Sequence, residues 1–461
     1  MRFRVIILLN KNSHIHLVGI GGVSMSGIAE ILAERGYKVS GSDLNESKYL
    51  DLLRKYDIDL FIGHAAANIE GADLIVKTSA IPEDNPEIKA AQKKGLKIVK
   101  RAEMLSYLMR KKKTIAVAGT HGKTTVTAML AAIFKEAKAD PAVMVGGFLK
   151  ELNGNMADGD GQYFITEADE SDGSFLYFNP DLLLVNNLEL DHPDFYQNLD
   201  EFKNIFKRFA DKNDKQAILL YNKDDKNLHS LFKDRKKSSG FSLKKGDFKA
   251  ANIKYDKFKS SFDFYQAGEF IASIELSVPG EYNLYNALAA ASAARQLEID
   301  LESIRAALKK FSGVGRRFDF KGRVLNAAVD VVDDYAHHPT EIKELLKTVK
   351  NMDYNKIRVI FQPHRYSRTH KFFQEFTDAF ADADQVYLTD IFSASEKNKY
   401  NISMTEFAEK IAANSAVECS YCADFNQIAD RLLAEAEAGD IILTVGAGNI
   451  TDLSDLIVKK N

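Results

Sequence analysis

Short apolar runs alternate with amphipathic segments along most of the chain, a pattern typical of parallel β-sheets covered by helices on both faces. Near the start, residues 15–20 predict a buried strand and residues 24–35 a helix with apolar positions on one side. Two more strands are predicted at 72–81 and 96–102. Such βαβ repeats predict a first Rossmann-like domain over residues 1–107.

The middle of the chain predicts a second sheet of a different composition. Residues 162–169, 180–192 and 216–222 are nearly continuous apolar runs, as expected for central parallel strands. Residues 238–278 instead alternate in short segments and predict antiparallel hairpins, a small β element attached to this domain. We therefore expect a central domain with a parallel or mixed sheet over residues 108–315.

The last part of the chain returns to the alternation of strands and helices. A strand is predicted over 324–334 and a helix over 370–383, among others, without repeats or low-complexity tracts. This predicts a third, Rossmann-like domain over 316–461. Three α/β domains also suit a length of 461 residues, because single cores rarely grow beyond about 250–300 residues.

Charge and cysteine content narrow the functional classes. Lys and Arg number 62 against 65 Asp and Glu, a net charge of −3, so no overall field attracts nucleic acid or an anionic membrane. Residues 1–12 hold too few consecutive apolar positions for a signal peptide or a membrane span, so we expect a cytoplasmic protein. Cys419 and Cys422 cannot complete a zinc site alone and fit a reducing compartment.

The strongest chemical signal is the stretch AVAGTHGKTT at residues 116–125, a short apolar strand, a glycine turn and the start of a helix. Backbone N–H groups of such a turn bind phosphate oxygens, Lys123 would reach the β- and γ-phosphates, and Thr124 would place its hydroxyl on Mg²⁺. The first glycine of the usual G-x-x-x-x-G-K-[ST] pattern is replaced by Val117. The stretch nevertheless predicts an ATP site.

A second glycine loop follows the first predicted strand. Gly19, Gly21 and Gly22 allow close approach of a diphosphate, and Asp43 lies at the end of the next strand, while Ser24 occupies the place of the third glycine of G-x-G-x-x-G. The loop is compatible with a dinucleotide cofactor and with another nucleotide diphosphate.

Polar clusters follow several predicted strands, where the sheets would present them to a ligand. Acidic residues crowd 167–173 and 187–196, and carboxylates are the ligands that Mg²⁺ prefers. In the last domain, residues 333–338 and the loop around Arg365 combine aspartate, histidine and arginine. The planar guanidinium groups suit recognition of an amino-acid carboxylate.

Nine motifs occur in the order and spacing of the Mur ligases, and together the chain resembles that family over essentially its whole length: GIGGVSMSGIAEILAERGYKVSGSD, AGTHGKTT, EADESDGSFL, NLELDHPDFY, PGEYNLYNALAAA, GVGRRFD, VDDYAHHPTE, FQPHRYSRT and GAGNI. The resemblance implies three domains, which bind UDP-N-acetylmuramate, ATP and an amino acid in that order. It favours the branch that adds L-alanine. One departure is Tyr282, where the family usually has histidine.

The resemblance also implies roles for individual residues. The ATP site would comprise Gly119, Thr120, His121, Gly122, Lys123, Thr124, Thr125, Asn283, Asn286, Arg317 and Asp334. The UDP-sugar site would comprise Gly19, Gly21, Gly22, Ser24, Asp43 and Ser79. The amino acid and the lactyl group would meet Tyr335, His337, His338, His364, Arg365 and Arg368. Metal ligands would be Thr124, Glu167 and His192, and the catalytic residues Lys123, Arg317 and His338, the last as general base.

The activity implied is an ATP-dependent ligation of L-alanine to the lactyl carboxylate of UDP-N-acetylmuramate through an acyl phosphate, in peptidoglycan precursor synthesis. We expect ATP and two Mg²⁺ ions, with Mn²⁺ as a substitute, in a monomer or weak homodimer that closes around its substrates. A recycling ligase that attaches a tripeptide to the same sugar is the near alternative. An NAD-dependent oxidoreductase or a nucleotide switch would leave most of the motifs unexplained.

Overall fold

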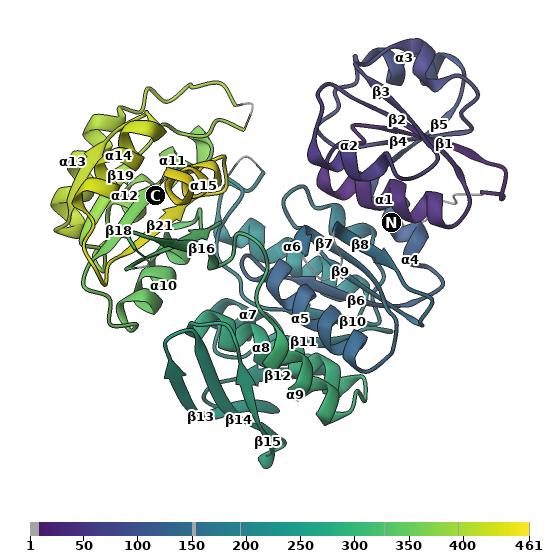
Figure 1. Cartoon of the computed structure of the whole chain (residues 1–461). Helices are drawn as coiled ribbons and strands as arrows, with labels where there is room; N and C mark the ends of the chain where they lie inside the picture. The colour runs from purple at the N-terminus through teal and green to yellow at the C-terminus, as the bar shows by residue number, and fades with distance from the viewer. Residues whose placement is uncertain (1–8, 150–153, 194, 327, 395, 461) are drawn as a thin grey trace.

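The computed structural model describes residues 9–149, 154–193, 195–326, 328–394 and 396–460, which form three β-sheets covered by helices (Figure 1). The predicted α/β class is therefore confirmed. Most of the opening segment 1–12 lies outside the described residues. Within the described ranges, no helix combines the length and apolar character needed to cross a membrane.

The first sheet has five strands in the order β3-β2-β1-β4-β5, and all its pairs are parallel. The strands are β1 (His14–Val18), β2 (Lys38–Asp43), β3 (Ile58–Ile62), β4 (Leu74–Lys77) and β5 (Lys97–Lys100). The helices are α1 (Val23–Glu34), α2 (Lys48–Leu53), α3 (Pro86–Lys93) and α4 (Arg101–Met109). Strands β4 and β5 are shorter than predicted; β5 ends early because α4 begins at once.

The central sheet has ten strands in the order β15-β14-β13-β12-β11-β10-β6-β9-β7-β8. The strands are β6 (Lys113–Ala118), β7 (Ala142–Leu149), β8 (Gly154–Asp158), β9 (Tyr163–Glu167), β10 (Leu182–Val185), β11 (Ile218–Asn222), β12 (Ser238–Ser242), β13 (Phe248–Asp256), β14 (Lys259–Gln266) and β15 (Glu269–Leu276). The helices are α5 (Lys123–Glu136), α6 (Leu199–Lys212), α7 (Lys226–Phe232), α8 (Glu281–Gln296) and α9 (Leu301–Lys310). Strand β6 lies between β10 and β9, parallel to both.

The hairpins predicted at 238–278 exist, but they continue the central sheet. Strand β12 pairs parallel with β11 and with β13, and the antiparallel pairs in this segment are β13–β14 and β14–β15. The inward side chains of these strands, among them Phe248, Phe262 and Phe264, are buried in the same apolar cluster as α5 and α8. Because that cluster covers both parts, the hairpins are not a separate element.

The third sheet has six strands in the order β16-β17-β21-β18-β19-β20. The strands are β16 (Asp319–Val324), β17 (Val329–Asp334), β18 (Ile357–Phe361), β19 (Gln385–Leu388), β20 (Glu418–Tyr421) and β21 (Ile441–Val445). The helices are α10 (Pro339–Lys350), α11 (Tyr366–Lys371), α12 (Phe373–Thr377), α13 (Met404–Ser415), α14 (Phe425–Glu435) and α15 (Thr451–Lys460). All the strand pairs except β16–β17 are parallel.

Two predictions for this part were wrong. The single strand over 324–334 is the end of β16 and all of β17, because Leu325 and Asn326 both have positive φ and the chain reverses there. The single helix over 370–383 is broken at Phe372, where φ is −107° and ψ is 25°. The Phe372 ring packs edge-on against His338, with the ring centroids 4.8 Å apart.

The first and central sheets share one continuous apolar cluster, whereas the third sheet has clusters of its own. Helix α1 packs on β8, where Arg35 forms an ion pair with Asp158 (Nε–Oδ2 2.7 Å). The third part contacts the central one through polar pairs, including Arg368 with Asp191. Figure 1 shows the central part between the other two.

Candidate active site

The predicted phosphate loop lies between β6 and α5. Gly119 has a φ of +133° and Gly122 a φ of +80°, which only glycine adopts without strain. A Cβ on Gly122 would lie 2.6 Å from the amide nitrogen of Asn186. The loop is also tied to the segment after β10, because the N–H groups of Thr120 and His121 donate to Asn187. The loop geometry is therefore built by residues on two parallel strands.

Lys123 opens α5 and pairs with a carboxylate that the sequence analysis did not select. Its Nζ lies 2.8 Å from Oε1 of Glu170 and donates to the carbonyl of Thr120. Burial alone would lower the pKa of Lys123, but Glu170 and Asp169 more than offset this, so the pKa lies above its usual value. Lys123 stays cationic, as phosphate binding requires.

The predicted metal ligands lie on both sides of this pair. Thr124 donates a hydrogen bond to Glu167, and burial raises the pKa of that carboxyl. His192 lies 3.2 Å (Nε2–Oε1) from Glu170, and Asp169, Glu170 and His192 together could hold a metal ion. The other oxygen of Glu170 is buried and has no hydrogen-bond partner. The carboxylates of Asp169 and Glu170 supply the oxygen ligands that Mg²⁺ prefers, and the buried oxygen of Glu170 is available for such a contact.

A cavity of about 490 Å³ opens beside the phosphate loop, a size that suits a nucleotide. Of the predicted ATP-site residues, His121, Gly122, Thr125, Asn286, Arg317 and Asp334 line it. We call it the nucleotide cavity. The cavity is also lined by residues that the sequence analysis did not select, including Asn186, Asn187 and Tyr285.

Asn283, Tyr282 and Asp334 differ in how they relate to this cavity. Asn283 does not line the nucleotide cavity; its amide donates to the carbonyl of Pro279 (2.7 Å) and accepts from Asn286. Tyr282 does line it, and its hydroxyl is buried without a partner. Asp334 accepts the N–H groups of Phe318 and Ala336, while burial raises its pKa to about 6.

A second cavity, of about 790 Å³, is lined by all three parts of the chain. We call it the acceptor cavity. Its wall comprises Ser79 and Ala80 from the first part, Asp169, Ser171, Asp172, His192 and Phe195 from the second, and Tyr335, His337, His364, Arg365, Ser367, Arg368, Ala394, Glu396, Lys397, Lys399 and Tyr400 from the third. Five of the six residues predicted to meet the amino acid and the lactyl group are therefore together.

His338 is the sixth, and the structure places it elsewhere. Its side chain is 6% exposed and lines neither cavity, and its Nδ1 accepts the N–H of Thr340 at the start of α10. His337 faces the acceptor cavity instead, and burial lowers its pKa to about 3. The geometry does not favour His338 as the base for an amine in that cavity.

Arg368 lines the acceptor cavity but is already paired. Its guanidinium donates to both carboxylate oxygens of Asp191 at 3.0–3.2 Å, and the two side chains are 5% and 4% exposed. Burial alone would raise the pKa of Asp191, yet Arg368 holds it well below its usual range. Arg368 therefore acts first as a link between the central and third parts.

The first glycine loop lies next to the acceptor cavity without lining it. Gly19 has a φ of +85°, and a Cβ there would lie 2.8 Å from Thr78, the residue before Ser79. The N–H of Gly21 donates to Asp43 (2.9 Å), so this aspartate shapes the loop itself. Ser24 is part of α1. Binding of a diphosphate at this loop stays a prediction.

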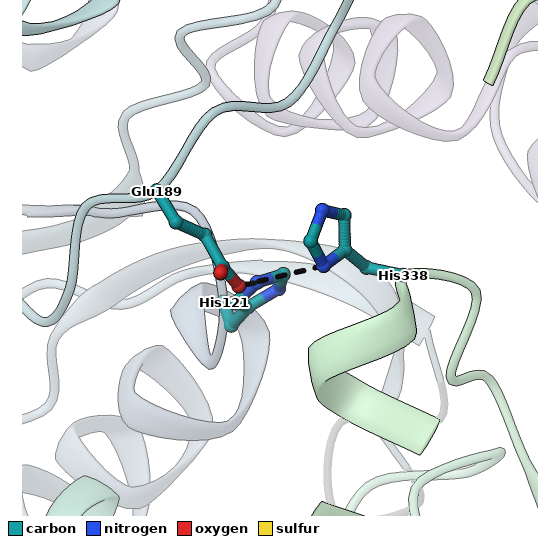
Figure 2. Close-up of side chains that lie close together, drawn as sticks. All are labelled: His121, Glu189 and His338. Atoms are coloured by element: carbon teal, nitrogen blue, oxygen red, sulfur yellow. Dashed lines mark hydrogen bonds and ion pairs between the residues drawn. The ribbon is translucent and has the colours of Figure 1, made fainter. Parts of the chain in front are cut away.

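Figure 2 shows His121 of the phosphate loop beside Glu189 and His338. These three side chains offer ligand atoms within 4.8 Å of one another and could also hold a metal ion. His121 contacts Glu189 and Glu341, and although burial alone would lower its pKa, the two carboxylates raise it to about 10. At neutral pH the ring of His121 is therefore protonated, and its positive charge lies between the two carboxylates.

These loops, sheets and cavities define an ATP-dependent ligase of the three-domain α/β kind, and sequence comparison agrees. Three family descriptions match in order: the Mur ligase family catalytic domain (residues 14–113), the Mur ligase middle domain (117–294) and the Mur ligase glutamate ligase domain (316–448). The chain belongs to the Mur ligase family.

Individual relatives narrow the comparison. The UDP-N-acetylmuramate–L-alanine ligase of Clostridium acetobutylicum is 43% identical over 449 residues, 97% of each chain. That of Geotalea uraniireducens is 42% identical and covers 98% of this chain and 99% of its own. Among solved structures, the UDP-N-acetylmuramate-alanine ligase of Thermotoga maritima superposes with a TM-score of 0.83 at 31% identity, covering 97% of this chain and 98% of its own.

Proposed function

We propose that this protein joins L-alanine to the lactyl carboxylate of UDP-N-acetylmuramate, with hydrolysis of ATP to ADP and phosphate, in peptidoglycan precursor synthesis. The names of the relatives that are 42–43% identical over almost the whole chain support this activity. The observation that carries the proposal is the acceptor cavity, because all three parts of the chain line it and it reaches Asp169 and His192 beside Lys123.

The chemistry requires activation of a poor acyl donor. A carboxylate oxygen of the lactyl group attacks the γ-phosphorus, the bond to the β–γ bridging oxygen breaks, and ADP leaves with the electron pair. Lys123 and the N–H groups at the start of α5 stabilise charge on the phosphoryl group. Arg317, which lines the nucleotide cavity 4.9 Å from the ring centre of Tyr335 in the acceptor cavity, lies where it can contact the same group.

The second step forms the amide bond. The alanine amine attacks the acyl carbon, the carbon–oxygen bond to phosphate breaks, and phosphate leaves with the electron pair and takes up the proton that the nitrogen loses. Burial lowers the pKa of His337 to about 3 and that of His364 to about 4, so both rings are neutral at pH 7. They can therefore accept hydrogen bonds and orient the amine, while Arg365 supplies a cation for a carboxylate.

The proposal also includes divalent cations, which the phosphate oxygens of ATP would coordinate. Thr124 and Glu167 would hold one Mg²⁺, and His192 with Asp169 or Glu170 a second, with Mn²⁺ as a substitute. Bound there, Mg²⁺ would neutralise phosphate charge.

We also propose that the three domains meet at residues 107 and 315, as the sequence predicts.

A phosphate-release assay tests the activity directly. Purified protein with ATP, Mg²⁺ and UDP-N-acetylmuramate is compared with L-alanine, glycine, L-serine or a tripeptide as the acceptor amine. Release that depends on both the UDP-sugar and L-alanine is expected. Preference for the tripeptide would identify the recycling ligase instead, and release independent of the sugar would refute the proposal.

A further inference from the structure

Glu341 is the last residue of the motif VDDYAHHPTE, but the sequence analysis gave it no role. It is the third residue of α10, and its side chain is 11% exposed. One carboxylate oxygen, Oε1, accepts from Nδ1 of His121 at 3.0 Å and lies 3.6 Å from the guanidinium of Arg317. Both partners line the nucleotide cavity, and one of them belongs to the phosphate loop.

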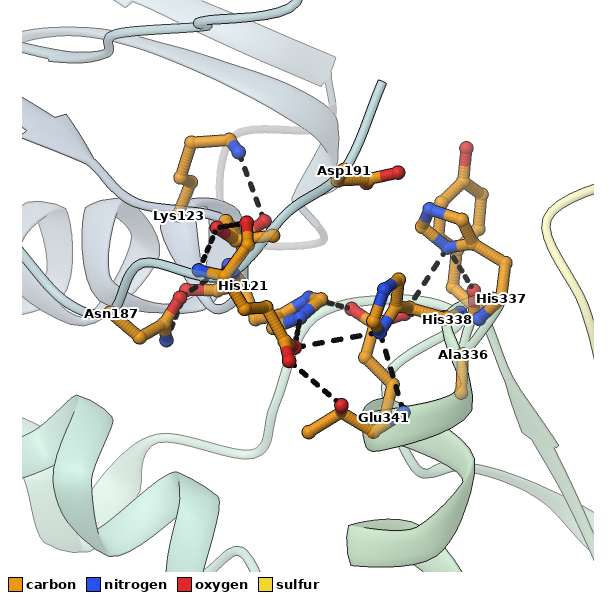
Figure 3. A network of polar contacts seen from close by, with 12 residues as sticks. His121, Lys123, Asn187, Asp191, Ala336, His337, His338 and Glu341 are labelled. Atoms are coloured by element: carbon orange, nitrogen blue, oxygen red, sulfur yellow. Dashed lines mark hydrogen bonds and ion pairs between the residues drawn. The ribbon is translucent and has the colours of Figure 1, made fainter. Parts of the chain in front are cut away.

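The other oxygen of Glu341 faces the acceptor side. Oε2 accepts the N–H of His337 at 3.0 Å and that of His338 at 3.2 Å, and lies 3.3 Å from Nδ1 of His337. His337 lines the acceptor cavity. Figure 3 shows this carboxylate between the phosphate loop and the turn that carries both histidines. A single side chain therefore contacts residues of both cavities.

The carboxylate is held ionised by its partners. Burial alone would raise the pKa of Glu341, whereas the histidine and arginine neighbours hold it well below its usual range. Glu341 is also the capping-box glutamate of α10, so its position is tied to the first turn of that helix. Any displacement of this turn moves the carboxylate away from His121 and Arg317.

We propose that Glu341 is a positioning residue that couples the two cavities: it holds His121 and Arg317 at the nucleotide while fixing the turn that presents His337 to the acceptor. The inference rests on the proposed function for the identity of the two ligands. A UDP-sugar that orders the turn would then improve the nucleotide site, and by linkage the nucleotide would improve binding of the UDP-sugar equally.

The test uses the full-length protein and a matched control. Glu341→Gln keeps the shape and removes the charge; Glu406→Gln makes the same change at the third residue of α13, which is 63% exposed, pairs with Lys410 and lines neither cavity. The affinity for a non-hydrolysable ATP analogue with Mg²⁺ is measured by calorimetry, with and without UDP-N-acetylmuramate.

For the wild type we expect the UDP-sugar to tighten analogue binding by about 5- to 100-fold. In Glu341→Gln the ratio of the affinities with and without UDP-sugar should fall to about 1 and kcat should fall about 10- to 100-fold, whereas Glu406→Gln keeps both within about 2-fold. A merely structural role would weaken binding of the ATP analogue, but the UDP-sugar would still tighten it by the wild-type factor. Glu341→Asp, which keeps the charge, should recover part of that factor.

A wild-type ratio near 1, or a wild-type ratio retained in Glu341→Gln, would overturn the proposal. Circular dichroism melting shows whether a variant is folded; if Glu341→Gln is not, Glu341→Asp decides, since its ratio should lie between the two limits. A wild type that binds both ligands but releases no phosphate with L-alanine would refute the proposed function and leave the coupling measurable.

Discussion

The buried pair of Arg368 and Asp191 allows a quantitative prediction. Replacement of Asp191 by asparagine removes the negative charge of the pair. The guanidinium, which is 5% exposed, then faces a neutral amide. Breaking a buried ion pair from one side costs about 3–5 kcal/mol. Because this pair joins the central and third parts across 177 residues, the loss should appear in the free energy of unfolding of the third part.

The pH dependence follows from the lowered pKa of Asp191. A carboxyl whose pKa is lower in the folded than in the unfolded state contributes its full stability above the unfolded value of about 4 and loses it as the pH falls below that. The difference between wild type and Asp191→Asn should therefore be constant near neutral pH and shrink in acid.

Urea unfolding at pH 7, followed by far-ultraviolet circular dichroism because the chain has no tryptophan, measures the effect. The control is Glu406→Gln, which removes an exposed helical pair with Lys410 and should change stability by less than about 0.5 kcal/mol. Combining Asp191→Asn with Arg368→Met should recover part of the loss. Stability of Asp191→Asn within about 1 kcal/mol of the wild type would refute the reasoning.

Three further predictions concern the nucleotide site. Lys123→Ala should abolish phosphate release while leaving UDP-sugar affinity within about 2-fold, and loss of sugar binding would contradict the assignment of these ligands to different domains. Gly122→Ala should weaken ATP binding at least about 10-fold, because its Cβ would collide with Asn286; Gly36→Ala, with a similar φ of +79° but open space around it, should leave ATP affinity unchanged. Asp334→Asn should remove a pH dependence of unfolding: burial raises the pKa of Asp334 to about 6, so the folded wild type binds this proton more tightly and loses about 3 kcal/mol between pH 4 and 7. Equal slopes of stability against pH in that variant and the wild type would contradict this.

Local patterns predicted the parts of the site that depend on neighbours in sequence. The phosphate loop needs a strand, glycines at 119 and 122 and a helix, and all are readable in ten residues. Thr124 and Glu167, two of the predicted metal ligands, also lie in contact, because both are at the ends of adjacent elements around parallel strands. The resemblance to the Mur ligases extended the prediction to residues of the acceptor cavity.

Partners that are distant in sequence could not be predicted in the same way. In the run EADESD, burial alone distinguishes Glu170, fully enclosed beside Lys123, from ordinary loop carboxylates. The pairing of Asp191 with Arg368 depends on how the third part docks. His337 and His338 are neighbours in the chain, and only the cap of α10, which uses the second ring, decides which one faces the acceptor cavity.

The continuous apolar cluster of the first and central sheets has a mechanical consequence. Sliding these two parts would expose packed side chains, whereas the third part has clusters of its own and is joined to them largely by polar pairs such as Arg368 with Asp191 and His121 with Glu341. Mechanically, the enzyme is thus two bodies rather than three. The short connection between α9 and β16 links the two bodies and carries Arg317 to the nucleotide cavity, so a rotation of the third body about this connection would move that guanidinium with it.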